Sequence, residues 1–592
     1  MPVEYWVPDD LEVFVPCTHD GGEFSPIMSF VPSGGLRLKK DAKVADLDQV
    51  QPDQLEGIDR LDKLHVCHAP AILHALRIRY ARQQIYTAVQ RMIVAVNPFR
   101  KVDCCSPEVR LKYLAAERSK DLEPSVFSVG LDAVGGLRHP EQSKRRSQAV
   151  LISGESGAGK TECAKLVLDY VTLKIQADDM KKGGKGRASL CKPQIQEQIM
   201  KTNPVLEAFG NAMTARNNNS SRFGKWLQMP VSQKEGIQGC SITDYVLEVS
   251  RVCSQSKKDR NYHVFFQLLA GKASGDDLFE GVEMLQAGQY SFLTKGNLEA
   301  PGIDDSTGFR ELKDAFGVLG IQRDSQVEII KVAMGILTLG NLTFATDPAS
   351  NDDAAQLTDP ASGKMAADLL GVDPEELRKA ILVFTGKAGA ETITKERKKS
   401  EADRTRDSLA RVLYGKLFKW LITKINSLLG QGMDSPTFFG VLDIAGFESF
   451  EANSLEQLFI NLTNELLQGH FNDYFFEAQK QEYKAEGLTV EVSFKDNTDV
   501  VALVGYRVDK GASKQGILDV LDDSAKTATA DDQAFYNQLK KVHEQHERMV
   551  WPKVKSLDFT VRHFAGDVKY TATGFREKNS DRPPESTGAL LA

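Results

Sequence analysis

Short apolar runs recur along the chain and are separated by longer amphipathic stretches. Residues 84–99, "QIYTAVQRMIVAVNPF", predict two strands, the second of which ends at Asn97. Residues 149–152, "AVLI", predict another strand, and residues 435–450, "SPTFFGVLDIAGFESF", contain a strand of the buried type that ends at Asp443. Each of these strands runs directly into a polar segment.

Two stretches have apolar residues at helical spacing. One runs from Thr161 through Leu173, and the other covers residues 454–485, which are rich in aromatic residues and poor in helix breakers. Because the predicted strands are separated by long helical stretches, the pattern predicts an α/β sheet with large helical insertions.

The remaining pattern predicts small or irregular segments. Residues 5–40 are short apolar runs broken by "PDD", "HDGG" and "PSGG", which indicates a small β-rich module. Residues 176–192, "QADDMKKGGKGRASLCK", predict an exposed surface loop, and residues 217–226 predict a polar turn that leads into an apolar strand. Residues 583–592 have few structure signals and predict an unstructured tail.

The composition of the chain mainly excludes certain classes of protein. With 592 residues, 41% of them hydrophobic and 26% charged, the chain is too long for one core, so several subdomains are expected. No apolar stretch approaches about 20 residues, so membrane insertion is not expected, and the N-terminus does not resemble a signal peptide. The formal net charge of −7 argues against a general nucleic-acid binder. The eight cysteines form no CxxC pair, which favours a reducing, intracellular location over disulfides or a zinc site.

The segment "SGESGAGKTE" after the strand at 149–152 fits a phosphate-binding loop. Gly154 and Gly159 allow backbone N–H groups to turn toward a phosphate, Lys160 would neutralise phosphate charge, and the Thr161 hydroxyl would ligate Mg²⁺. The helix that follows would add the partial positive charge of its N-terminus. The alternative is a glycine-rich turn with a solvated lysine.

A second stretch, "NNNSSRFGK" at 217–225, supplies what hydrolysis needs beyond a phosphate cradle. Ser221 would ligate Mg²⁺, Ser220 would face the γ-phosphate, and Arg222 would pair with a carboxylate. Taken alone, the stretch is equally well read as a common polar loop.

A third stretch, "DIAGFE" at 443–448, completes the set. Asp443 would hold a Mg²⁺-bound water, Gly446 offers a backbone N–H to the γ-phosphate, and Glu448 is a partner for Arg222. Alone it is only a strand-to-loop corner. Together the three stretches match a phosphate loop and two switches, each near a strand end, where an open α/β sheet binds ligands.

These stretches resemble the nucleotide site of the myosin motor head. The resemblance extends over about residues 5–580, and the details of "NPFR" and "APGIDD" resemble divergent myosins of apicomplexan-type protists. Further stretches that resemble myosin in the right order are "NPVLEAFGNAMTARNNNSSRFGKW" (203–226), "YVLEVSRV" (245–252), "RNYHVFFQLLAG" (260–271), "NSLEQLFINLTNELLQGHFN" (453–472), "GILDVLDD" (516–523) and "HFAGDVKYTATGFREKN" (563–579).

The resemblance implies the fold of a P-loop NTPase. Its central twisted sheet would be mixed and mostly parallel, with large helical insertions and a small N-terminal SH3-like β module. The implied subdomains are the SH3-like module (1–55), an N-terminal motor subdomain with the phosphate loop (56–192), an upper 50 kDa-like subdomain with the first switch (193–442), a partial lower 50 kDa-like subdomain with the second switch (443–580), and a tail (581–592).

The resemblance also implies the site residues, with ATP and Mg²⁺ as substrate and cofactor. Asn97 matches the purine-side loop, with Lys101 nearby. The implied ATP-binding residues are Asn97, Lys101, Gly154, Glu155, Ser156, Gly157, Ala158, Gly159, Lys160, Thr161, Glu162 and Asn217; the Mg²⁺ ligands are Thr161, Ser221 and Asp443; and the catalytic residues are Ser220, Arg222, Gly446 and Glu448.

The implied function is that of an actin-activated Mg-ATPase motor on cytoplasmic actin filaments. A helix from Asn453 to about Lys484 would relay the movement of the second switch. Glu391 would give a surface loop the acidity needed for strong actin attachment, residues 516–545 would form an actin-facing helix-loop-helix, and the loop at 180–192 would tune nucleotide release. Glu391 is otherwise a solvated loop carboxylate.

The sequence departs from the family at several positions. Cys104 and Cys105 stand where a tyrosine usually follows the purine-side loop, Val249 replaces a lysine, and no tryptophan lies near Val490. After Asn579 the family continues into a sheet strand, a converter and a lever, so we expect a C-terminally truncated motor whose light chains or calmodulin would bind only to the absent lever.

Three other functions would use parts of the same motifs. A non-motile, nucleotide-sensing actin-binding module would keep the same pocket residues and is the main alternative. A microtubule motor would have a histidine after "SSR", where Phe223 stands here. A metabolic phosphate-loop kinase would not need the paired Arg222 and Glu448.

Overall fold

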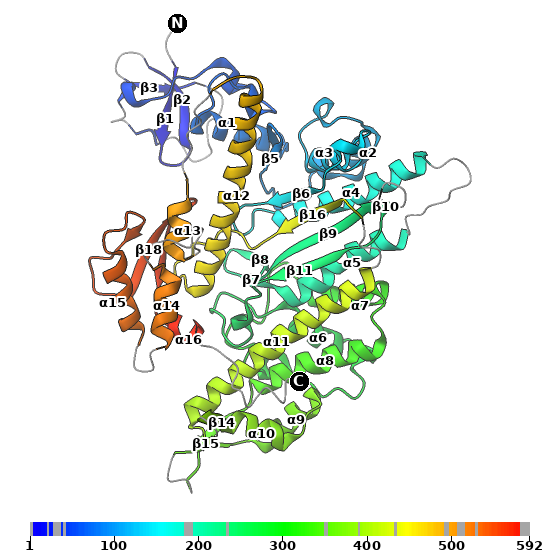
Figure 1. Cartoon of the computed structure of the whole chain (residues 1–592), viewed down its shortest axis with the longest axis vertical. Helices are drawn as coiled ribbons and strands as arrows, with labels where there is room; N and C mark the ends of the chain where they lie inside the picture. Colours follow the sequence, from blue (N-terminus) through cyan, green and yellow to red (C-terminus); the bar gives the residue numbers. More distant parts are fainter. Residues whose placement is uncertain are drawn as a thin grey trace.

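The computed structural model builds the chain around one central sheet, with helical layers beside it and a small β module at the N-terminal end (Figure 1). Within the residues it describes, no helix is both long and apolar enough to cross a lipid bilayer. The structure describes residues 4–19, 23–27, 37–39, 43–182, 193–232, 236–348, 353–388, 391–430, 435–489, 496–505, 515–526 and 531–579.

The central sheet is mixed, as expected, but most of its described pairings are antiparallel. Its order is β10–β9–β16–β6, with β11 also pairing with β9. Only β16 and β6 run parallel among these described pairs, so the expectation of a mostly parallel sheet is wrong. For β9 with β10 and β9 with β11 the reason is local, since short connections join these strands and permit only antiparallel neighbours. The antiparallel pairing of β9 with β16 joins strands that are far apart in the sequence. The strands are β6 (Gln148–Ile152), β9 (Gly224–Ser232), β10 (Gly236–Ile237), β11 (Ser241–Tyr245) and β16 (Phe438–Asp443).

The register of this sheet brings three polar segments to one edge. In the parallel pair, Asp443 at the end of β16 lies beside Ile152 at the end of β6. In the antiparallel pair, the same Asp443 lies beside Lys225 near the start of β9. The segments after β6, before β9 and after β16 therefore meet at the same end of the sheet. Among the described strands β6 is the last in this order, and its Leu151 is 43% exposed.

The largest hydrophobic core extends from Ile85 to Val441 and combines the sheet with helices on both of its faces. Aromatic side chains contribute to this core, and the ring centroids of the stacked Tyr262 and Tyr414 lie 4.8 Å apart. Its helices are α2 (Pro107–Ala115), α3 (Val126–Leu137), α4 (Lys160–Lys182), α5 (Pro193–Gly210), α6 (His263–Ala273), α7 (Asp305–Leu319), α8 (Arg323–Leu339), α9 (Pro360–Leu370), α10 (Pro374–Leu382) and α11 (Lys399–Leu429).

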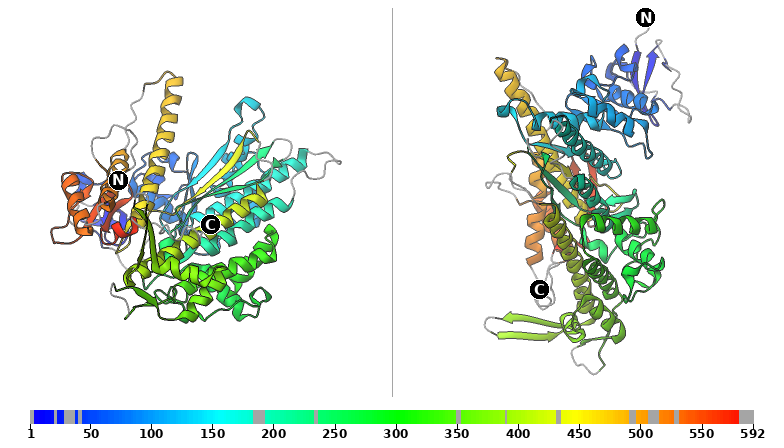
Figure 2. Two further views of the ribbon diagram at one scale, coloured as in Figure 1. Left: turned by 60° about the horizontal axis from the view of Figure 1, so that its bottom comes forward. Right: turned by 90° about the vertical axis from the view of Figure 1, so that its right-hand side faces the viewer.

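A second core extends from Phe447 to Phe575. It joins the start of the long helix α12 to a small antiparallel sheet and several short helices, and the far end of α12 projects from the body of the molecule (Figure 2). Its elements are α12 (Leu455–Ala485), α13 (Thr498–Val504), α14 (Ile517–Lys526), α15 (Asp532–His543), β17 (Met549–Val550), β18 (Asp558–His563), β19 (Gly566–Thr571) and α16 (Phe575–Asn579).

The N-terminal part has small cores of its own, one around Val7 and one around Ala71. Three antiparallel strands form the module, and α1 follows it. These elements are β1 (Glu4–Asp9), β2 (Val13–His19), β3 (Phe24–Pro26) and α1 (Ala69–Ala81); the remaining strands form the hairpins β4 (Tyr86–Val89) with β5 (Met92–Ala95), β7 (Asn211–Thr214) with β8 (Asn217–Ser221), β12 (Phe344–Thr346) with β13 (Ala355–Leu357), and β14 (Val383–Ala388) with β15 (Glu391–Glu396).

The strands predicted within 84–99, at 149–152 and within 435–450 are confirmed, and so is the long helix at 454–485. Two other predictions are wrong. The expected loop at 176–192 begins as helix, since α4 continues to Lys182, where it is supported by ion pairs of Asp178 and Asp179; residues 183–192 lie outside the described part. The expected polar turn at 217–226 contains strand β8, because the paired strand β7 takes up its backbone hydrogen bonds.

Candidate nucleotide site

The loop between β6 and α4 has the geometry of a phosphate cradle. Gly157 and Gly159 have φ angles of 83° and 88°, in the left-handed region that glycine adopts without steric cost. The amide of Asn97 donates to the carbonyl oxygen of Gly157 at 2.7 Å and braces the loop from the β4–β5 side. The Lys160 ammonium donates to the carbonyl oxygens of Gly154 and Glu155 at 3.0 and 2.8 Å, so it is held at the mouth of the loop.

The charge of Lys160 depends on its neighbours. Burial lowers the pKa of this ammonium, while the nearby carboxylates of Asp443 and Glu448 act in the opposite direction. Lys160 thus lies in a site where carboxylates from the third motif already surround it.

Three oxygen-bearing side chains from three different segments converge beside the loop. The hydroxyl of Thr161 lies 3.4 Å from the Ser221 hydroxyl and 3.5 Å from a carboxylate oxygen of Asp443. Asp443 is buried, and its second oxygen lies 3.8 Å from the ammonium of Lys225. Lys225 also donates to Asn203 at 3.1 Å, so this cation is anchored on the far side of Asp443. Sequence reasoning missed Lys225, although it follows the first switch directly.

The second switch lies against the phosphate loop. A Cβ placed on Gly446 would lie 2.1 Å from the carbonyl oxygen of Gly154 and 2.3 Å from the ammonium of Lys160. No side chain fits in that space without moving the loop backbone. Glycine at position 446 is therefore required by the approach of two backbones in this arrangement.

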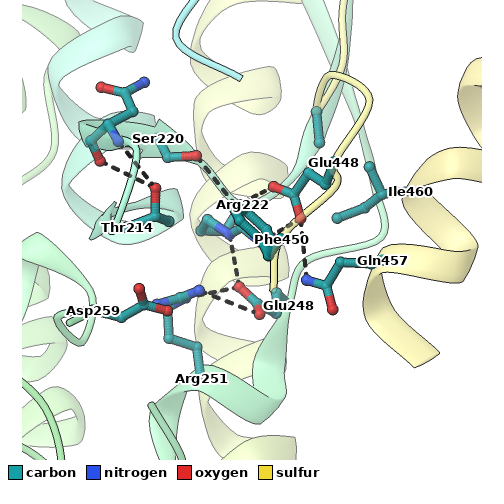
Figure 3. A network of polar contacts seen from close by, with 12 residues as sticks. Thr214, Ser220, Arg222, Glu248, Arg251, Asp259, Glu448, Phe450, Gln457 and Ile460 are labelled. Atoms are coloured by element: carbon teal, nitrogen blue, oxygen red, sulfur yellow. Dashed lines mark hydrogen bonds and ion pairs between the residues drawn. The ribbon is translucent and has the colours of Figure 1, made fainter. Parts of the chain in front are cut away.

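Arg222 and Glu448 form a buried, two-pronged ion pair between the first and second switches (Figure 3). Nη1 lies 2.6 Å from one oxygen of Glu448, and Nη2 lies 3.4 Å from the other. Nη1 also donates to the hydroxyl of Ser220 at 3.2 Å. Each ionic side chain is only about 2% exposed, so neither charge is compensated by solvent.

A second carboxylate on Arg222 was not foreseen. Nε donates to Glu248 at 2.7 Å, and Glu248 also accepts from Arg251 at 2.7 Å (Figure 3). Burial alone would raise the pKa of Glu248, but the two guanidinium groups lower it to about 2. Burial likewise opposes the charge of Arg222, yet its two carboxylates raise its pKa well above the ordinary value. The segment "YVLEVSRV" contains both Glu248 and Arg251, but only the fold brings them to Arg222.

Glu448 is also held from the second core. Asn461 of α12 accepts from the Glu448 backbone N–H and donates to its carbonyl oxygen, both at 2.8 Å. The same amide donates to the Tyr570 hydroxyl at 2.7 Å, and that hydroxyl lies 2.8 Å from a ring nitrogen of His563. The second switch is thus connected by buried hydrogen bonds to α12 and to β18 and β19.

The remaining predicted residues are spread around this centre. Asn217 lies next to the loop, with its Cβ 3.9 Å from a Cβ built on Gly157, and Ser220 is buried beneath Arg222. Lys101 and Glu162 are exposed, and Glu162 pairs with Lys165 on the surface of α4. Glu155 is exposed and Ser156 and Ala158 are half-buried in the loop itself.

Other predictions lie away from the loop or outside the described residues. Glu391 begins β15, in a hairpin at the opposite end of the molecule from the N-terminal module (Figure 1). Helices α14 and α15 lie within the expected helix-loop-helix at 516–545. Val490 lies outside the described residues.

The donor set fits Mg²⁺ and a triphosphate. Mg²⁺ prefers hard oxygen ligands and is commonly held by one or two protein oxygens together with phosphate oxygens and water. Two hydroxyls and a carboxylate beside the glycine loop meet this requirement, and Thr161 lies in the first turn of α4, directly after the loop. Lys160 and the N-terminus of α4 would balance phosphate charge.

Comparison with known proteins gives a consistent result. The model of the family described as "Myosin head (motor domain)" matches residues 58–591. "Myosin-7" of Arabidopsis thaliana is 37% identical over 558 residues, 93% of this chain and 31% of that protein. "Myosin-I heavy chain" of Dictyostelium discoideum is 34% identical over 549 residues, 92% of this chain and 22% of that protein. "Myosin-2 heavy chain, non muscle" of Acanthamoeba castellanii is 35% identical over 535 residues, 90% of this chain and 34% of that protein. The chain thus spans about a third or less of the length of these relatives.

Proposed function

The chain belongs to the myosin head (motor domain) family, and from this premise we propose that it hydrolyses ATP with Mg²⁺ and couples the reaction to filamentous actin. One observation carries the proposal. Ser221 and Asp443, which come from segments far apart in the sequence, each have an oxygen within 3.5 Å of the Thr161 hydroxyl beside the phosphate loop. A chance glycine turn would not gather this donor set.

The side chains of the site have different roles in the proposed reaction. The glycine loop and Lys160 bind the phosphates, while Thr161, Ser221 and Asp443 hold the cation, which neutralises charge on the β- and γ-phosphates when bound. Ser220 and the Gly446 N–H would orient the γ-phosphate and the attacking water. The buried pair of Arg222 and Glu448 would exclude bulk water by holding the two switches together.

Helix α12 would transmit the movement of the second switch away from the nucleotide site. Because Asn461 on this helix is bonded to Glu448, a shift of the second switch on phosphate release would move the helix with it. The boundary proposed at residues 442 and 443 is supported by the two large cores, because the first core ends at Val441 and the second begins at Phe447. Buried residues from 85–192 and from 193–442 share the first of these cores, while those around Ala71 form a small core of their own.

Actin contact is the less direct part of the proposal. The hairpin that contains Glu391 and the helices α14 and α15 are surface elements, as an actin interface requires. We place the protein on cytoplasmic actin filaments because the chain belongs to the myosin head family. The non-motile, nucleotide-sensing module keeps the same pocket, and no observation in the described residues favours it over the motor.

Phosphate release with and without filamentous actin tests the proposal. The wild type should turn over ATP, filaments should accelerate the reaction, and Lys160→Ala should abolish it. Lys364→Ala removes an exposed cation from α9, which contains no residue assigned to the site, and should leave the rate unchanged. A wild type that binds ATP but releases no phosphate contradicts the ATPase proposal, and turnover that filaments do not change contradicts the coupling to actin.

A further inference from the structure

Two adjacent cysteines lie on a short turn near the nucleotide site. Cys104 and Cys105 belong to the 3-10 turn Asp103–Cys105, at the position where the sequence departs from the aromatic residue usual in the family. Neither residue is fully buried. In contrast, Cys17, Cys240 and Cys253 are buried in the cores.

The turn forms part of the wall of a cavity of about 580 Å³. Cys104 lines this cavity together with Tyr86, Tyr113 and Arg79. Cavities of this size admit small organic ligands. A reagent in the cavity therefore meets a thiol directly, with the second thiol on the next residue.

Contacts on the turn place both sulfurs in polar surroundings. The Tyr86 hydroxyl lies 3.2 Å from the sulfur of Cys105, and the Cys104 thiol donates to the carbonyl oxygen of Gln83 at 3.7 Å. The hydrogen bond from Cys104, and after it the bond to Tyr86, outweigh burial and lower the pKa of Cys105 to about 6. The titratable groups that act on this cluster are Cys104 on the same turn, Tyr86 on β4 and Cys163 on α4.

We propose that Cys104 and Cys105 form a dithiol site for soft, thiophilic ligands, with trivalent arsenic compounds as the chemical class. Thiolate sulfur is the protein ligand that soft centres prefer. In the reaction of an organic arsenic oxide, two arsenic–sulfur bonds form and the arsenic–oxygen double bond is replaced. The oxygen leaves as water with the two thiol protons. Arsenic remains trivalent, so no oxidant or reductant is needed.

An arsenic atom that bridges the two sulfurs should also affect the nucleotide site, and this consequence rests on the proposed function. Tyr86 pairs with Ala95 in the β4–β5 hairpin, and Asn97, two residues beyond Ala95, braces Gly157 of the phosphate loop. A bulky group on Cys105 displaces the Tyr86 hydroxyl from its contact. We therefore expect the bridged protein to bind nucleotide, ADP included, less tightly.

Phenylarsine oxide tests the site. The full chain is treated with this reagent under reducing-agent-free conditions, passed through a desalting column and weighed by intact-mass spectrometry. One adduct per chain should remain and should be removed by 2,3-dimercaptopropanol. Because a second attachment point typically raises retention by a factor of about 100 or more, singly held reagent should be lost on the column.

Cysteine variants locate the adduct. Cys104→Ser and Cys105→Ser should each lose it, whereas Cys67→Ser, which removes a more exposed single thiol, and Cys163→Ser should keep it. Circular dichroism establishes that each variant is folded. An adduct that persists in either Cys104→Ser or Cys105→Ser, or one that disappears in Cys163→Ser, overturns the proposed pair.

A final arm separates this site from the proposed function. Fluorescent ADP is titrated into bridged and unbridged protein, and bridging should weaken binding severalfold. If the adduct forms on the pair but nucleotide affinity is unchanged, the dithiol site stands and its coupling to the phosphate loop is overturned. If neither protein binds nucleotide, the proposed ATPase function fails while the adduct still tests the site.

Discussion

Arg222 donates from Nε to Glu248 across 2.7 Å, and this largely buried ion pair lies beside the pair that Arg222 forms with Glu448. The guanidinium therefore holds two carboxylates, and Glu248 in turn holds a second guanidinium, that of Arg251. Removing one member of such a cluster leaves an uncompensated buried charge, which typically costs about 3–5 kcal/mol. The connection between the two switches thus depends on a network of charges.

This network changes the outcome expected of a charge swap. Arg222→Glu and Glu448→Arg should each abolish the rapid phase of phosphate release, because each leaves like charges facing one another in a buried site. The double variant restores a pair but turns the new carboxylate toward Glu248. Adding Glu248→Gln removes that repulsion, so the triple variant should recover more activity than the double.

The measurement is a single-turnover assay of phosphate release. A gain of about tenfold for the triple over the double variant would correspond to about 1.4 kcal/mol of relieved repulsion. Glu248→Gln alone serves as the control. A triple variant no faster than the double would contradict the role assigned to Glu248.

Gly446 should not tolerate a methyl group. A Cβ there meets the Gly154 carbonyl at 2.1 Å, so Gly446→Ala should hold the second switch away from the loop and suppress hydrolysis more than ATP binding. The check is a comparison of nucleotide affinity with the chemical step. Gly317→Ala, on α7 with open space at the Cβ position, should leave both unchanged. Normal hydrolysis in Gly446→Ala would mean that the close approach is not part of the working state.

Substitution of the three proposed Mg²⁺ ligands should change how strongly Mg²⁺ increases nucleotide affinity. ADP affinity is measured by titration calorimetry with and without Mg²⁺. Thr161→Ala, Ser221→Ala and Asp443→Asn should each reduce the gain that Mg²⁺ provides and leave metal-free affinity nearly unchanged. Thr423→Ala on the exposed face of α11 is the matched control. An undiminished Mg²⁺ effect in all three variants would place the metal elsewhere.

Acid should weaken the network through Glu248. Its pKa of about 2 in the folded protein lies below the ordinary 4.5, so its stabilisation is complete above about pH 4.5 and is lost as the pH falls toward 2. The shift corresponds to roughly 3 kcal/mol. The difference in urea unfolding midpoint between wild type and Glu248→Gln should therefore be large at pH 7 and shrink between pH 4.5 and pH 3. The exposed Glu117→Gln should show no such trend, and a constant difference for Glu248→Gln would contradict the assignment.

The sequence was informative wherever chemistry is local. The glycine loop, the two serines before Arg222 and the aspartate at the end of β16 each follow from neighbouring residues, and the parallel pairing of β6 with β16 brings them together. The Arg222 and Glu448 pair was also predictable, because each residue belongs to a motif whose chemistry requires a partner. The family match extends this reasoning to the whole fold, while the apicomplexan-type origin stays a prediction.

The sequence was less informative where a role depends on long-range burial. Glu248, Lys225 and Asn461 lie in stretches that look like ordinary polar positions, and only packing aims them at Arg222, Asp443 and Glu448. The antiparallel character of the sheet was missed for a related reason. A strand that is buried on both faces has a continuous apolar run whether its neighbours are parallel or antiparallel, so the run indicates burial and leaves the direction of the neighbours open.

The chain crosses from the first core to the second between Val441 and Phe447, directly beside the phosphate loop. The 31-residue helix α12 begins soon after this crossing and is about 46 Å long. A tilt of about 5° at its base therefore displaces its tip by about 4 Å. A sub-ångström rearrangement around a phosphate group can therefore become a displacement of several ångströms at the far end of α12, if the helix rotates about the segment between Val441 and Phe447.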